Sequence, residues 1–154
     1  MAAATLSEIL NIRLRESIRE DKSGTYGVGG RVSLTNMPRP TFTTMVQFGC
    51  NPDRSEELVQ ACIDVFDKLR KEPPTADEMK KAKELHRRNR EIGLKENGYW
   101  LSSIEQYLKN GEDLALIMDF EKRLDALTAD DVFNAAKKYL DISTMKTFIA
   151  MPEK

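Results

Sequence analysis

The chain opens with apolar residues spaced as on one face of a helix, and we predict that this helix runs from Leu6 to Glu20. Its apolar stripe comprises Leu6, Ile9, Leu10, Leu14 and Ile18. Thr5 and Glu8 stand at its start with the spacing of a capping box, in which each side chain satisfies a backbone N–H. The following Ser23-Gly24 pair is expected to end the helix, because glycine tolerates the left-handed C-cap conformation.

The pattern then changes to an alternation of apolar and polar positions, which predicts strands at 26–34 and 41–50. The connection at 36–40 contains two prolines, which cannot donate ladder hydrogen bonds, and it is typical of a turn. Because the connection is short, the two strands are expected to pair antiparallel. The three glycines in the first strand indicate a place where another backbone or a ligand comes close; they are Gly27, Gly29 and Gly30.

Helical spacing returns after the second strand and continues through most of the chain. Residues 51–53 (Asn-Pro-Asp) are expected to start one helix, and the prolines at 73–74 to stop it. Thr75 and Glu78 form a second predicted capping box, at the start of a long helix that extends to His86 or beyond.

The remaining segments are predicted as helices at 99–108 and 112–126, a helix that begins at Thr128, and a strand at 144–151. This order of elements predicts an α+β fold with helices packed on one face of a small antiparallel sheet. Residues 1–154 fit one domain. Three strands are few for so much apolar helix surface, so the sheet looks incomplete, and its exposed strand edges predict self-association.

Composition excludes some classes of function. The chain is 40% hydrophobic and 32% charged, and Lys and Arg (24) nearly balance Asp and Glu (25). A nucleic-acid binder needs an excess of positive charge, so we expect no nucleic-acid partner. We also expect no membrane partner, because no apolar run approaches the roughly 18 residues that cross a bilayer. The cytoplasm and the periplasm both stay open as compartments.

Reactive side chains are few. Cys50 and Cys62 lie among apolar neighbours and are expected to be buried free thiols, although a single bridge between them stays open. His86 is the only histidine and is expected on a helix surface. The basic run at 80–90 is interrupted by acidic residues, which is typical of a solvated helix face with i,i+4 ion pairs.

The segment 13–34, RLRESIREDKSGTYGVGGRVSL, resembles the C-terminal half-domain of the insulinase/pitrilysin family of zinc metallopeptidases. The family pattern there is an Arg-Glu pair, a short turn with glycine, and a tyrosine seven residues after the arginine. The matching positions are Arg19, Glu20, Gly24 and Tyr26. The resemblance continues more weakly along the rest of the chain, which would then be a partial copy of the family's α/β sandwich repeat.

The resemblance implies a substrate-side role without zinc chemistry in this chain. The family's catalytic repeat carries the inverted motif His-x-x-Glu-His, and one histidine cannot supply it, so zinc is expected in the other half of a longer protease. In the family, the arginine and the tyrosine contact the substrate backbone and help stabilise the tetrahedral intermediate. Arg19 and Tyr26 are therefore the candidate positioning residues, with Gly27 allowing a peptide to approach.

The partners implied are a peptide or protein substrate and an N-terminal zinc-bearing half, in the same chain or in a separate subunit. Two other functions stay open. The family includes members that lost the metal site and serve as structural or assembly proteins, and the chain could also be a free-standing peptide-binding module. The sequence that precedes this segment in the full-length protein would distinguish a structural or assembly protein from a protease, since only the protease needs His-x-x-Glu-His.

Overall fold

The computed structural model describes residues 1–20, 25 and 27–151, and for residues 19 and 20 it describes the backbone alone. The longer elements are α1 (Ala2–Leu14), β1 (Val28–Thr35), β2 (Thr41–Phe48), α2 (Ser55–Lys71), α3 (Ala76–Gly93), α4 (Asn97–Lys109), α5 (Phe120–Ala126) and α6 (Ala129–Tyr139). A π-helical turn, η1 (Arg15–Glu20), extends α1, and 3-10 turns occur at η2 (Pro52–Arg54), η3 (Leu114–Ile117) and η4 (Ile142–Thr144). The fold is α+β, as the sequence predicts.

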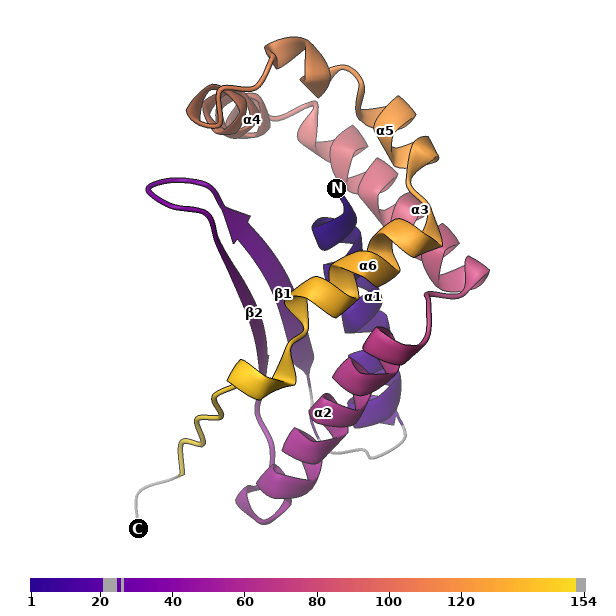
Figure 1. The fold of residues 1–154 in the computed structure, drawn as a ribbon, viewed down its shortest axis with the longest axis vertical. Coiled ribbons are helices and arrows are strands. Elements are labelled where there is room, and N and C mark those ends of the chain that lie inside the picture. Colours follow the sequence, from indigo (N-terminus) through magenta and orange to yellow (C-terminus); the bar gives the residue numbers. More distant parts are fainter. Residues whose placement is uncertain (21–24, 26, 152–154) are drawn as a thin grey trace.

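The two strands form an antiparallel hairpin in which Val28 lies opposite Phe48 and Thr35 opposite Thr41. Helices α1, α2 and α6 lie toward one side of this hairpin, while α3 leads away to α4 and α5 at the far end of the molecule (Figure 1). The strand residues that face the helices include buried Val32, whereas the opposite face carries exposed polar residues such as Arg31. One face of the sheet is therefore open to water, as antiparallel sheets allow.

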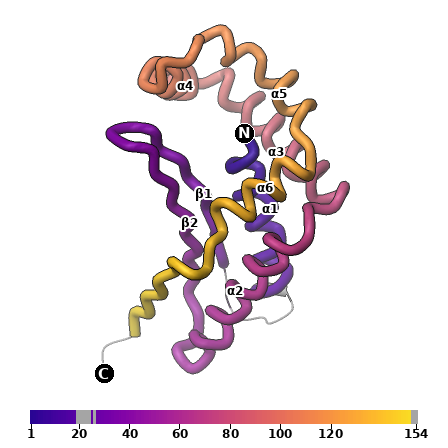
Figure 2. Tube along the Cα trace, viewed as in Figure 1, coloured from indigo at the N-terminus to yellow at the C-terminus, as the bar shows by residue number. Residues whose placement is uncertain are grey.

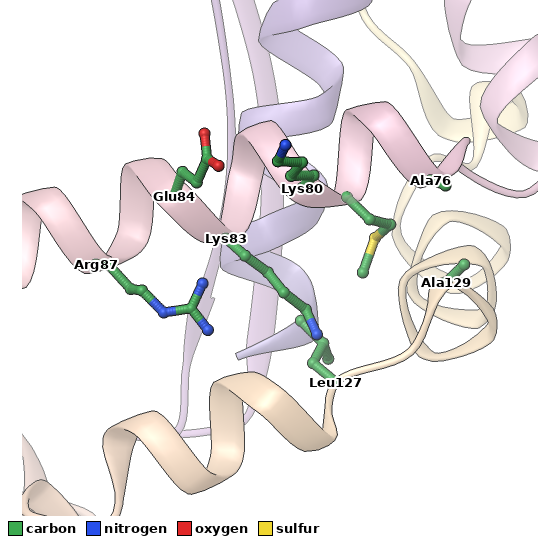
Figure 3. A pocket seen from close by; sticks show the side chains of 8 residues that line it. Ala76, Lys80, Lys83, Glu84, Arg87, Leu127 and Ala129 are labelled. Atoms are coloured by element: carbon green, nitrogen blue, oxygen red, sulfur yellow. The ribbon is translucent and has the colours of Figure 1, made fainter.

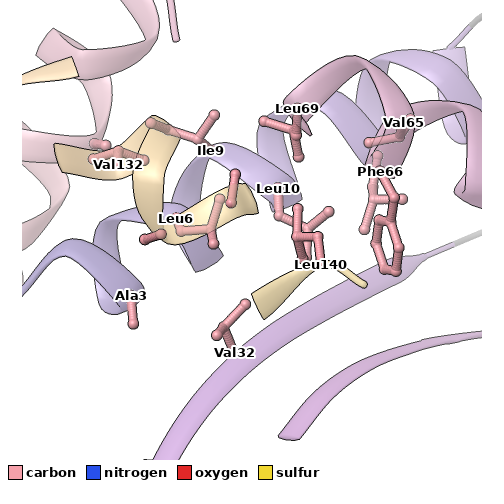
Figure 4. Packing of buried hydrophobic residues seen from close by; sticks show 14 of the residues in the cluster. Ala3, Leu6, Ile9, Leu10, Val32, Val65, Phe66, Leu69, Val132 and Leu140 are labelled. Carbon is pink, nitrogen blue, oxygen red and sulfur yellow. The ribbon is translucent and has the colours of Figure 1, made fainter. Parts of the chain in front are cut away.

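The hydrophobic core is organised around the predicted apolar stripe of α1. The five residues of this stripe are fully buried, and side chains from α2, α6 and β1 pack around them (Figure 4). The packed residues include Val32, Val65, Leu69 and Val132. Burial of a leucine or isoleucine side chain contributes about 1.5–3 kcal/mol, so this stripe contributes strongly to the stability of the core.

The start of α1 differs from the prediction. The helix begins at Ala2, and Thr5 is completely buried inside it instead of capping it. Alanine is the strongest helix former, and Ala3 packs into the core, so the helix includes the alanines before Thr5. The second predicted capping box is confirmed: Thr75 accepts from the N–H of Glu78, and Glu78 accepts from the N–H of Thr75.

The predicted strand at 144–151 is wrong. The chain forms the η4 turn, where Asp141 accepts from the N–H of Ser143, and continues to residue 151 without regular structure. Phe148 is 91% exposed. The trace leads from α6 past the foot of the hairpin and away from it (Figure 2), and the part of this segment that the structure describes pairs with neither β1 nor β2. Alternation alone does not make a strand without a partner.

The predicted helix at 112–126 is also divided. Asp113 accepts a hydrogen bond from the N–H of Ala115 and starts the η3 turn, so α5 begins only at Phe120. The two cysteines are both free thiols: Cys62 is buried and Cys50 is half-buried. Burial raises the pKa of Cys62 to about 12, which leaves it an unreactive thiol at neutral pH.

Candidate functional site

The predicted site residues lie where the first helix ends and the first strand begins. Arg19 belongs to the η1 turn, where its backbone is described and its side chain is not. Tyr26 lies outside the described residues. Gly27 is exposed and directly precedes β1. The predicted contacts of the Arg19 and Tyr26 side chains with a bound peptide therefore stay a prediction.

The core holds the backbone on the approach to Arg19. Ile18, its neighbour in the sequence, is fully buried, and so is Leu14 at the end of α1. Between them the chain widens into the π-helical turn η1, an irregularity that is frequent at functional sites. Ile18 therefore anchors in the core the residue that directly precedes Arg19.

On the strand side, Thr25 fixes the backbone at Gly27. The Thr25 hydroxyl accepts a hydrogen bond from the N–H of Gly27 and lies within donating distance of the carbonyl of Gly49, at the end of β2. A β-carbon added at Gly27 would meet no atom within 4 Å. A β-carbon at Gly27 would therefore be tolerated without a clash, and the Gly27 N–H already has a partner.

Side chains of α1 bind the backbone of β1 at two points. The Asn11 amide donates to the carbonyl of Gly30 at 2.8 Å and accepts from its N–H at 2.7 Å. The Ser7 hydroxyl accepts from the N–H of Val32 at 2.8 Å. A β-carbon at Gly30 would lie 2.8 Å from Cδ2 of Leu10, so the close approach predicted from the glycines is that of α1. These contacts fix the register between α1 and β1.

A shallow groove of about 410 Å³ runs beside this contact, on the solvent side of the hairpin. Its lining combines Asn11 and exposed strand residues, and the only charged group among them is Arg31. The lining is Asn11, Gly29, Gly30, Arg31, Met45 and Gln47.

A second groove, of about 530 Å³, lies between α3 and the segment that joins α5 to α6 (Figure 3). Its lining includes Lys80, Lys83 and Arg87. Lys83 donates to the carbonyl of Asp125, and Arg87 bridges to the carboxylates of Glu121 and Asp125. Two of its three cations therefore tie α3 to α5. The predicted i,i+4 pairing also occurs, between Lys81 and Asp77.

An ion pair that the sequence did not predict joins the C-terminal end of α1 to the start of α3. Arg13 donates from Nε to Oε1 of Glu78 at 2.6 Å and from Nη2 to Oε2 at 3.0 Å, and both side chains are largely covered. Burial alone would raise the pKa of Glu78, but the hydrogen bonds from Arg13 and from the N–H of Thr75 lower it. Glu78 thus caps α3 and joins it to α1, and no local sequence signal pairs residues so far apart.

His86 differs from its predicted surface position. Its ring is half-buried, and its Nε2 is joined to the Thr5 hydroxyl by a hydrogen bond of 3.0 Å, which links α3 to α1. Burial lowers its pKa, and the N-terminal ammonium adds to this. Among the described residues, no group of three His, Cys, Asp or Glu side chains is placed to hold a metal ion. None of the described helices is long and apolar enough to cross a bilayer.

Comparison with known proteins places this geometry in a family. The family model described as the peptidase M16 inactive domain matches residues 1–85. The chain is 26% identical to the probable zinc protease PqqL of Escherichia coli over 140 residues, which are 91% of this chain and 15% of PqqL. It is 28% identical to the chloroplastic stromal processing peptidase of Pisum sativum over 129 residues, which are 82% of this chain and 10% of that protein.

Two solved structures have folds similar to that of this chain. The crystal structure of periplasmic PqqL matches with a TM-score of 0.74 and 27% identity, covering 90% of this chain and 15% of that one. A peptidase M16 inactive domain from Pseudomonas fluorescens matches with a TM-score of 0.74 and 25% identity, covering 91% of this chain and 34% of that one. The chain thus spans only 10% to 15% of the curated relatives described above.

Proposed function

This chain belongs to the family of peptidase M16 inactive domains, and on that premise we propose that it acts as the substrate-side, non-zinc-binding C-terminal domain of a zinc metalloendopeptidase. The observation that carries the proposal is the family match over residues 1–85, which includes the whole segment from α1 to β2. Because the chain spans a small share of its curated relatives, we also propose that it is part of a longer protease.

In this proposal Arg19 supplies hydrogen-bond donors to the bound peptide. An arginine presents a planar, charged fork of donors that suits a carbonyl oxygen or a developing oxyanion. Tyr26 would add a phenolic donor, and the open space at Gly27 would admit the peptide backbone. The buried anchor Ile18 and the Asn11 contact to β1 support the two sides of this site. Zinc, in the other half of the protease, would activate the attacking water.

The test is an Arg19→Ala variant of the full-length protein that contains this chain, assayed on a peptide substrate. We expect the turnover number to fall by a factor on the order of 100–1,000, as when an oxyanion donor is removed, with the thermal midpoint unchanged. Arg19→Lys should not restore the rate, because lysine lacks the planar fork. Arg88→Ala, which removes an exposed arginine of α3, is the matched control and should leave the rate unchanged.

Unchanged turnover in Arg19→Ala would refute the positioning role. A full-length wild-type protein with no peptidase activity, and with no His-x-x-Glu-His upstream, would support the structural or assembly role instead. Self-association through an exposed strand edge also belongs to the proposal.

A further inference from the structure

The backbone pairing between β1 and β2 stops just before it reaches Gly27. The last pair of the ladder is Val28 opposite Phe48, and the same register would place Gly27 opposite Gly49, although both glycines lie outside the strands. The backbone groups of Gly30 point toward α1, and these groups alternate in direction along a strand. Those of Gly27, three positions earlier, would therefore point toward β2, where the next ladder hydrogen bonds are expected.

The side chain of Thr25 takes this position instead. Its hydroxyl accepts a hydrogen bond from the N–H of Gly27 at 3.2 Å. The same hydroxyl lies within donating distance of two carbonyls, those of Gly27 and Gly49, and is closer to that of Gly49. A hydroxyl has one proton to donate and can accept at the same time. Thr25 can therefore bridge the start of β1 and the end of β2 with one group.

This bridge fixes the chain on both sides of one sequence position. A threonine hydroxyl that binds the N–H two residues further on forms a short turn closed by the side chain. Each peptide unit is planar, so few torsion angles remain free between two residues that are held in this way. Tyr26 stands between Thr25 and Gly27 in the sequence, and it is the residue to which the proposed function assigns a hydrogen bond to the peptide.

We infer that Thr25 is a positioning residue for the phenol of Tyr26, an inference that rests on the proposed role of Tyr26 in contacting the peptide. Thr25 acts through the backbone and needs no contact with the peptide itself. A donor that stabilises developing charge must be held in place, since a displacement of about 1 Å can lower a rate on the order of 100-fold. The hydroxyl bridge supplies this restraint on the strand side of the site.

The test is a double-mutant cycle in the full-length protein that contains this chain, with kcat and KM measured on one peptide substrate. Thr25→Val removes the hydroxyl but keeps the branched shape, and it should lower kcat about tenfold while KM changes less than about twofold. Thr25→Ser keeps the hydroxyl and should restore kcat. In Tyr26→Phe, which already lacks the phenolic donor, Thr25→Val should cause no further loss.

The matched control is Thr35→Val, at an exposed threonine at the other end of β1, and it should change neither constant. An equal loss from Thr25→Val in both backgrounds would overturn the inference, because Thr25 would then only support the hairpin. An unchanged kcat in Thr25→Val beside a reduced kcat in Tyr26→Phe would overturn this inference alone. An unchanged kcat in Tyr26→Phe would refute the proposed role of Tyr26 and this inference with it.

Hydrogen exchange of the full-length protein supplies a second readout that does not depend on activity. The Gly27 amide donates to the Thr25 hydroxyl, so it should exchange faster in Thr25→Val than in the wild type or in Thr25→Ser. Equal exchange rates in all three proteins would show that the bridge does not hold the chain at Gly27, and the inference would fail.

Discussion

Helices α1 and α4 have the same length of 13 residues, yet α1 contains seven buried residues and α4 contains none. Helix α1 lies in the centre of the core, whereas α4 lies at the far end of the molecule (Figure 1). Leu101 and Leu108 of α4 are 71% and 62% exposed. Two helices of equal length are therefore held by burial in one region and left largely uncovered in the other.

The α4 region is instead joined by polar contacts. Arg90 of α3 donates to the Tyr99 hydroxyl, the Trp100 indole N–H donates to the carbonyl of Leu94, and Arg123 of α5 donates to the Tyr107 hydroxyl. The Trp100 and Arg123 contacts are exposed and contribute little net stability, whereas the Arg90 contact is partly buried. The comparison therefore predicts a stable unit built on α1 and a second region that opens more easily.

The largest expected effect comes from truncating one leucine in each region. Leu10→Ala removes a fully buried side chain of α1 and should lower the free energy of unfolding by about 2–5 kcal/mol. Leu101→Ala, on the exposed side of α4, should change it by no more than about 0.5 kcal/mol. Urea denaturation of both variants measures the difference, and equal losses would contradict the division into two regions.

A smaller effect is expected where α1 meets β1. Gly30→Ala places a β-carbon 2.8 Å from Leu10 and should cost about 1–3 kcal/mol of unfolding free energy through overpacking. Gly29→Ala is the matched control, because a β-carbon at Gly29 meets no atom within 4 Å. Thermal denaturation of the two variants measures the difference. Only Gly30→Ala, at the glycine that packs against α1, should lower the thermal midpoint.

The two regions also show why some of the fold could be predicted from the sequence and some could not. The spacing of Leu6, Leu10 and Leu14 predicts a helix and its buried face, because that stripe meets the core. The same reasoning at Leu101 and Leu108 predicts the helix but not its exposure, which depends on whether another surface lies nearby. The segment 144–151 shows this limit for strands. Its apolar and polar residues alternate, but it does not pair with β1 or β2 and forms no strand.

The candidate site residues could not be predicted from the spacing of apolar residues, unlike the core. Arg19, Tyr26 and Gly27 came from a resemblance to a family, since neither periodicity nor composition distinguishes them from other polar or small residues. The contacts around the site are between residues distant in the sequence, such as the Arg13–Glu78 pair, which is separated by 65 positions. No local pattern encodes such a pairing, which only the packing of α1 against α3 brings about.

That ion pair gives the next prediction. Glu78→Gln should lower the unfolding free energy by about 1–2 kcal/mol at neutral pH, because it leaves the largely covered Arg13 without its charged partner. The pKa of Glu78 is lowered in the fold, so this stabilisation is present above the ordinary pKa of 4.5 and is lost as pH falls through the folded value. The wild type and the variant should therefore converge in acid; a constant difference would show that packing, not charge, is responsible.

The smallest effect is expected at His86, which joins the start of α1 to α3. Burial lowers its pKa below the ordinary 6.5, so the unfolded chain takes up a proton before the folded chain does. The contribution of His86 to the unfolding free energy is therefore fully present above pH 6.5 and is lost as the pH falls through the folded pKa. His86→Gln, which can keep a hydrogen bond to Thr5, should remove this dependence on pH.

The sign of the change in stability with pH distinguishes His86 from Glu8, a carboxyl group of α1 whose pKa is also shifted. Burial raises the pKa of Glu8 above 4.5, so protonation of Glu8 favours the folded state, and stability gained from it would increase as pH falls. Because His86 is the only histidine, a decrease in stability on mild acidification that disappears in His86→Gln is specific to the contact between α1 and α3. An identical decrease in the variant would show that another group titrates. The hydrogen bond between His86 of α3 and Thr5 of α1 would then not be the cause of the pH dependence.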